Sequence, residues 1–324
     1  MKNILIVMVC LFYQLTQAQD RIKDSTEGFS FEINYWFNLH HFLWMESFMN
    51  NEKDSTVIRQ EISKDSKRIL DEGLDYYKKE LTNLNLRSDD YMKEFKYWIT
   101  TQDFKLKKVP YKFQKHIAAL KGVSDVYKAS FWPEHKRACE KVLNDNINLI
   151  RRTEEKFAIG IQKLTRYRWQ NEKIKVDITY YGTATDWNLV HRPYTTLTPT
   201  HIVMTAIGEN DVVGNWVELL FHEASHHLIF SNYYFVGGTI KDVSEVMSFK
   251  VPRSFSHAYL FYLTGELTKQ IFIEEQQSYE TTYMQRRNVF GRYYTLLDKY
   301  LKPYMKREIT LEEATKKMLE EINN

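Results

Sequence analysis

The chain has 324 residues, of which 43% are hydrophobic and 27% charged, and its net charge at pH 7 is +3. This composition is typical of a globular protein with a substantial core, and so small a charge argues against a nucleic-acid-binding protein. Glycine and proline are scarce, with 11 and 6 residues, which favours long helices over a many-turned β fold.

The N-terminus has the pattern of an export signal. Lys2 precedes an apolar run, Ile4 to Tyr13, which is much shorter than the roughly 20 residues that cross a bilayer. The small residues Thr16 and Ala18 then precede a plausible cleavage site after Ala18. We therefore expect residues 1–18 to be a signal peptide and the mature chain to be periplasmic or secreted, with no membrane span.

Two apolar segments stand out in the first half of the chain. Residues 29–49, FSFEINYWFNLHHFLWMESFM, are apolar and aromatic throughout, and we expect them to form a buried helix. Residues 55–121 are more polar, and their apolar residues recur at helical spacing. Residues 130–164 predict one long helix, because Pro133 suits a first turn and apolar residues then recur at roughly helical spacing.

The pattern changes after the long helix. Ile174, Val176 and Ile178 alternate with polar residues, which predicts a half-buried strand over residues 173–181. Residues 198–206, TPTHIVMTA, predict a second strand. From residue 216 onward the sequence is helical. This order indicates an α+β fold, predominantly helical, with a small sheet before the helix that contains residues 222–226 and a helical C-terminal part.

The strongest functional signal is the stretch HEASH at residues 222–226, which fits the pattern H-E-x-x-H. Residues four apart on a helix project from one face, so His222 and His226 could bind one Zn²⁺. Glu223 would then lie beside the ion, where its carboxylate can hold a water molecule and take its proton. His227 lies about 100° round the helix from His226, so we do not expect it to bind the same ion.

This motif resembles that of the zincin metallopeptidases, and its layout is similar to their gluzincin branch. The resemblance extends over residues 174–272. It implies Zn²⁺ as cofactor, His222 and His226 as ligands, and Glu223 as general base. In gluzincins a strand before this helix forms the edge of the cleft and aligns an extended peptide by strand addition, a role that residues 198–206 would take. The longer metzincin pattern, with a glycine and a third histidine shortly after the motif, is absent.

A catalytic zinc site usually takes three protein ligands and one water molecule, and three later residues are candidates for the third ligand. His257 and Glu266 both lie in a segment, residues 255–267, that is apolar nearly all round, where a buried ionisable group needs a partner. They lie on opposite sides of the predicted helix, so only one can bind the ion. Glu245 lies on the polar side of a shorter helix. We predict His257, with Glu266 as the alternative and Glu245 less favoured. A histidine here departs from the glutamate of gluzincins, which puts that branch in doubt.

Five other residues carry weaker signals. Tyr194, Tyr259 and Tyr262 could donate a hydrogen bond to an oxyanion, although core packing explains Tyr259 and Tyr262 more simply. His40 and His41 lie in an apolar segment and fit core histidines better than cleft residues.

These patterns predict an exported zinc-dependent hydrolase, most simply a peptidase that cleaves amide bonds of a peptide or protein substrate. An N-terminal helical region, residues 19–165, would precede a zincin-like catalytic region, residues 166–324, although the two could form one domain. Two alternatives stay open. One is a non-catalytic zinc-binding protein, and the other is a structural helical protein whose histidines are part of the core.

Overall fold

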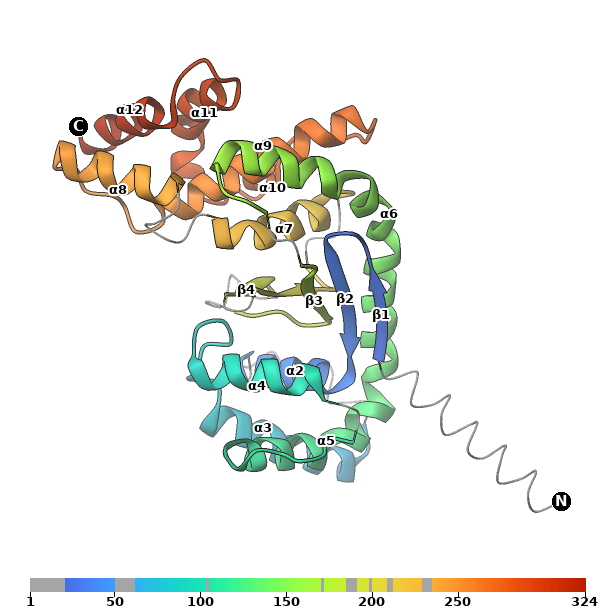
Figure 1. The fold of residues 1–324 in the computed structure, drawn as a ribbon. Helices are drawn as coiled ribbons and strands as arrows, with labels where there is room; N and C mark the ends of the chain where they lie inside the picture. Colours follow the sequence, from blue (N-terminus) through green and yellow to red (C-terminus); the bar gives the residue numbers. More distant parts are fainter. Residues whose placement is uncertain are drawn as a thin grey trace.

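The computed structural model describes residues 21–49, 62–102, 105–169, 172–184, 191–197, 200–208, 212–228 and 235–324. It is a predominantly helical α+β fold, which confirms the expected class. A mixed sheet of five strands lies between two layers of helices (Figure 1). The expected signal peptide falls outside the described residues, so export stays a prediction.

The sheet joins the two halves of the chain. Its order is β1-β2-β3-β5-β4, in which β2, β3 and β5 are parallel and the two outer strands are antiparallel to their neighbours. The bounds are β1 Arg21–Ser25, β2 Phe29–Asn34, β3 Ile174–Thr179, β4 Tyr194–Thr196 and β5 His201–Thr205. Because β2 pairs with β3, the two expected regions share one sheet.

One layer of helices comes from the first half of the chain, below the sheet in Figure 1. It consists of α2 Tyr35–Met49, α3 Lys64–Glu80, α4 Asp90–Thr101, the short 3₁₀ helix η1 Tyr111–Phe113 and α5 Gln114–Ser130. The long helix α6, Trp132–Thr165, contacts α5 in this layer and also α7 and α9 in the other. Its bounds confirm the predicted long helix, with Pro133 in the first turn.

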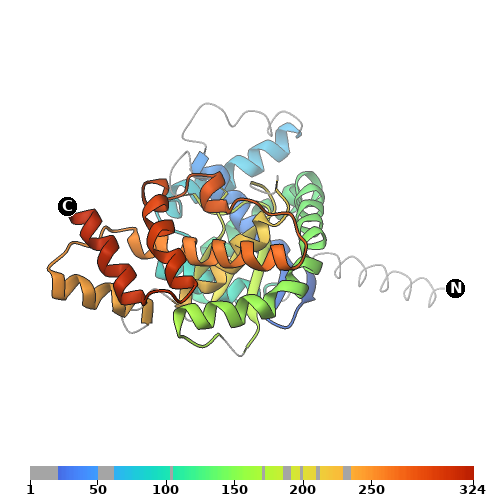
Figure 2. The ribbon, with the colours of Figure 1, turned by 90° about the horizontal axis from the view of Figure 1, so that it is seen from above.

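The other layer comes from the second half. It consists of α7 Asn215–Ala224, the 3₁₀ helix η2 Ser225–Leu228, α8 Phe235–Met247, α9 Phe255–Glu274, α10 Tyr283–Arg286, α11 Gly291–Met305 and α12 Leu311–Asn323. Figure 2 looks down on this layer, in which α9 packs against α6, α7 and α11. Of the helices that the structure describes, none is long and apolar enough to cross a bilayer.

The predicted helix over residues 29–49 is wrong in its first six residues. These form β2, and α2 begins only at Tyr35, where the side chain of Asn34 accepts a hydrogen bond from the backbone N–H of Phe37 at 3.0 Å. A strand that is buried on both faces shows no alternation, so periodicity cannot separate it from a buried helix. The charged edge strand β1 was not expected either, because its sequence, RIKDS, has no apolar pattern.

The two predicted strands exist, but their surroundings differ from the expectation. The polar side of β3 is not exposed to solvent, because helices of the first layer cover it and Asp177 is fully buried. Strand β5, within the predicted residues 198–206, lies inside the sheet, so it cannot be the cleft edge. The edge strand next to it is β4, for which the sequence predicted no strand. The prediction failed because three residues are too few to show a period.

A buried carboxylate on α6 holds the turn between β1 and β2. Glu154 accepts hydrogen bonds from the hydroxyl of Thr26 at 2.5 Å and from the backbone N–H groups of Glu27 and Gly28 at 3.0 and 3.1 Å. These bonds satisfy the buried hydroxyl of Thr26 and two partly buried N–H groups at the end of the hairpin.

We expect the substitution Glu154→Ala to lower the free energy of unfolding by about 3 kcal/mol, because it leaves buried donors unsatisfied. The exposed neighbour Glu155 provides the control, and Glu155→Ala should change stability by less than about 0.5 kcal/mol. Urea denaturation of both variants measures the difference. Equal stabilities would contradict this role of Glu154.

Candidate metal centre

Two neighbouring helices carry the residues of the HExxH motif and the predicted third ligand. His222 and Glu223 end α7, His226 lies in η2, and His257 lies in the first turn of α9. The change from α-helix to 3₁₀ helix inside the motif was not expected. The hydroxyl of Ser225 donates to the carbonyl oxygen of Phe221 at 2.7 Å at this point.

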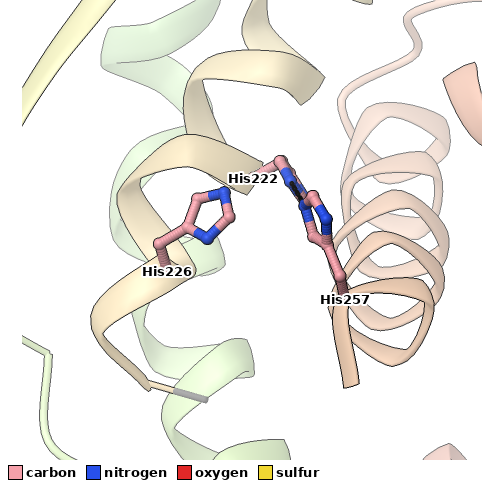
Figure 3. A group of neighbouring side chains, drawn as sticks. All are labelled: His222, His226 and His257. Atoms are coloured by element: carbon pink, nitrogen blue, oxygen red, sulfur yellow. Dashed lines mark hydrogen bonds between the residues drawn. The ribbon is translucent and has the colours of Figure 1, made fainter. Parts of the chain in front are cut away.

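The three imidazole rings converge (Figure 3). One ring nitrogen from each of His222, His226 and His257 lies within 4.8 Å of the other two. The Nε2 atoms of His222 and His257 are 3.1 Å apart. Two nitrogen ligands of one tetrahedral Zn²⁺ lie about 3.3 Å apart, so this spacing fits a shared ion.

The chemical state of the three rings also fits a metal. Burial lowers the pKa of His222 and His226 well below the ordinary histidine value and that of His257 to about 4. All three are therefore neutral at pH 7, and neutral imidazole is the form that binds metal ions. The hydroxyl oxygen of Thr264 on α9 lies 3.4 Å from Nδ1 of His222 and can accept a hydrogen bond from an N–H at Nδ1, which leaves the lone pair of Nε2 for a metal ion.

Glu223 lies beside the histidines on a buried side of the site. Its Oε2 is 3.4 Å from Nε2 of His226 and accepts a hydrogen bond from the hydroxyl of Thr195 on the edge strand β4 at 2.7 Å. Burial raises the pKa of Glu223 to about 7, against the hydrogen bond from Thr195 and the positive charges of Arg87 and Lys96, which lower it. A carboxylate with this pKa can both take and release a proton near neutral pH.

Arg87 brings a positive charge to the site from the other layer of helices. It lies in the loop between α3 and α4, where its backbone N–H donates to Oδ1 of Asn85 at 2.9 Å. Its guanidinium lowers the pKa of His226, His257 and Glu223, so its field reaches all three residues. The residue itself is exposed, and a positive charge whose field reaches the site favours negative charge that develops there.

A second buried carboxylate fixes the position of α7. Both oxygens of Glu218 accept hydrogen bonds from the backbone N–H of Tyr283, and Oε2 also accepts one from the hydroxyl of Tyr279 at 2.5 Å. Gly265 on α9 lies against the same carboxylate, where a Cβ atom would lie only 2.9 Å from Oε1. This close approach of α9 to α7 brings His257 next to His222.

The structure places the alternative ligands elsewhere. Glu266 lies on the side of α9 that faces α11, where the side chain of Tyr294 forms a hydrogen bond with it. Glu245 is exposed on α8 and pairs with Lys241 at 2.9 Å. Of the three predicted candidates, only His257 lies in the histidine group.

The weaker candidates lie in the core. The hydroxyl groups of Tyr259 and Tyr262 bond with Thr315 and Asp298, at 2.7 and 2.8 Å, on the side of the C-terminal helices. The hydroxyl of Tyr194 is 3.0 Å from Nε2 of His41 and lies on the sheet face opposite Glu223. The hydrogen-bond partners of these three hydroxyl groups all lie outside the candidate metal centre.

Two of the histidines outside the centre also have partners. Nδ1 of His40 is 3.0 Å from the hydroxyl of Tyr77 inside the first layer of helices. Nδ1 of His227 is 2.7 Å from the carbonyl oxygen of Ala224, so this ring turns away from the three ligands.

Thr195 and Arg87 are the residues of the site that the sequence did not reveal. Neither belongs to a motif, and each reaches the centre only through the fold, from β4 and from the loop before α4. The turn-forming residues around Arg87, NLNLRSDD, indicate a loop but give no sign of what it faces.

Comparisons of the chain with protein-family models, with curated proteins and with solved structures found no match, so the function must be argued from the geometry of the site alone.

Proposed function

We propose that the protein is a zinc-dependent hydrolase of zincin type that cleaves amide bonds in peptides. The observation that carries this proposal is the group of three buried, neutral imidazoles, His222, His226 and His257, with a carboxylate beside it whose pKa is raised to about 7. A bound Zn²⁺ would stabilise negative charge on a carbonyl oxygen and acidify water at the site.

The residues around the three ligands have separate tasks in this proposal. Glu223 takes a proton from the attacking water and delivers it to the leaving nitrogen. Thr195 orients the carboxylate of Glu223 through the bond to Oε2. Arg87 adds positive charge where the carbonyl oxygen becomes negative. A purely structural metal site has no use for an acidic group in this position, so Glu223 favours an enzyme over a non-catalytic zinc protein.

The proposed ligand set has three histidines, whereas gluzincins use two histidines and a glutamate. We therefore propose a zincin with Glu223 as general base, and we do not assign the protein to the gluzincin branch. Export of the mature chain after cleavage near Ala18 is part of the same proposal.

The first prediction concerns the metal. The purified mature chain should contain about one Zn²⁺ per molecule, and His257→Ala should lose most of it, because two remaining imidazoles bind zinc weakly. Glu266→Gln and Glu245→Gln serve as matched controls and should keep the metal. Elemental analysis after dialysis measures zinc. A His257→Ala variant that keeps full zinc, or a Glu266→Gln variant that loses it, would contradict this ligand set.

The second prediction concerns the base. Glu223→Gln keeps the shape of the side chain but cannot take a proton, so turnover should fall by about 10²–10⁴-fold while zinc content stays unchanged. Cleavage of a mixture of peptides, followed by mass spectrometry, measures the loss. Equal cleavage by the variant and the wild-type protein, with zinc bound in both, would exclude Glu223 as the base.

The third prediction concerns Arg87. Arg87→Ala should lower kcat/KM by about tenfold to a hundredfold with zinc retained, because it removes a charge that faces the developing oxyanion. Arg68→Ala on α3 removes the same charge from an exposed pair with Glu72, and it should leave kcat/KM within about twofold of the wild type. If both variants behave alike, Arg87 has no specific part in the reaction.

A further inference from the structure

A cavity lies on the side of the edge strand β4 that is opposite Glu223. It has a volume of about 700 Å³ and is bounded by α4, the segment around η1 and the end of β4. We call it the α4 cavity. Successive side chains of a strand point to opposite faces, so Thr195 reaches Glu223 while Thr196 lines the α4 cavity. The cavity is therefore separate from the metal centre.

Lys96 on α4 lines this cavity, and its ammonium group is buried, with no carboxylate in ion-pair contact among the described residues. The residue is only 2% exposed. Its Nζ donates one hydrogen bond, to the hydroxyl of Thr196 at 2.6 Å, and lies 4.8 Å from the centre of the Tyr194 ring. Within the described residues it forms no ion pair, and burial lowers its pKa to about 7. A buried ammonium needs an anion to offset its lost hydration.

The other charged residues around Lys96 are paired with one another. At the rim, Lys93 pairs with Asp90 and Lys112 with Glu94, so these charges cancel.

Farther from the rim, the carboxylate of Asp177 already has two partners. Its Oδ2 is 3.5 Å from Nζ of Lys175 and 2.5 Å from Nε2 of His201. Lys175 balances Asp177, and burial lowers the pKa of His201 to about 4, so its ring is neutral. Glu223, whose charge also acts on Lys96, lies on the opposite face of the sheet. On the cavity side Lys96 is thus the one lysine without an ion pair among the described residues, and one bound anion would supply its partner.

One side of the cavity is apolar. Trp98 and Phe113 pack with ring centroids 5.6 Å apart, and Pro110 and Leu197 complete this side. Pockets of this size hold small organic molecules, with apolar walls around the body and a few polar groups that fix its orientation. A ligand with one anionic end and an aromatic or aliphatic body matches both features.

We propose that the α4 cavity binds a small organic monocarboxylate, whose carboxylate pairs with Lys96 and whose apolar body packs against Trp98 and Phe113. The single lysine without an ion pair favours a carboxylate over a phosphate dianion, which would leave one negative charge unbalanced beside Asp177. None of the residues of the candidate metal centre lines this cavity, so its binding test is separate from the test of the proposed peptidase activity.

The test compares two ligands of the same shape. Titration calorimetry of the mature wild-type chain with 3-phenylpropionate should show binding at least tenfold tighter than with the neutral 3-phenylpropionamide. Inorganic phosphate should compete at least tenfold less well than the carboxylate. Equal affinity for acid and amide, binding of neither, or preferential binding of phosphate would overturn the proposal.

Two variants then locate the site. Lys96→Met keeps the length of the side chain without its charge and should lower the affinity for 3-phenylpropionate at least tenfold. Lys112→Met, at the rim, removes a charge that is already paired and should change affinity less than threefold. Unchanged affinity in Lys96→Met would refute the proposal. If Lys96→Met does not fold, the contrast between acid and amide on the wild-type chain, with the Lys112→Met control, decides the question.

Discussion

The contact between α7 and α9 is the constraint on which the metal centre depends. His222 and His257 are 35 residues apart in the chain, and their Nε2 atoms come within 3.1 Å only because the two helices pack closely. Gly265 permits the approach, and the buried carboxylate of Glu218 ties α7 to the first residue of α10. The HExxH motif brings two of the three histidines together locally, but the third joins them only through packing.

The three residues of β4 place different chemistry on the two faces of the sheet. Thr195 points to Glu223, whereas Tyr194 and Thr196 point to His41 and Lys96 on the opposite face. This division follows from the alternation of side chains along a strand. A shift of one residue in the pairing of β4 with β5 would exchange these contacts. Both candidate sites therefore depend on the register of this short strand pair.

The sequence was informative where the chemistry is local. The spacing of His222 and His226 and the isolated ionisable residues of the apolar segment around His257 both follow from helical periodicity, and they led to the three residues that the structure brings together. The edge strand β4, the role of Thr195 and the position of Arg87 could not be predicted, because each depends on contacts between distant parts of the chain. Strand β2 was mistaken for helix because burial on both faces removes the alternation that identifies a strand.

The pKa of Glu223 shows that the first half of the chain contributes to the candidate site. Burial alone would keep this carboxyl group protonated at neutral pH, in which state it cannot accept a proton. The hydrogen bond from Thr195 and the positive charges of Arg87 and Lys96 act against burial, and the balance lies at about 7. Both cations come from the first half of the chain, on either side of residue 90. The region that carries no recognisable motif thus sets the proton affinity of the residue at the centre of the motif.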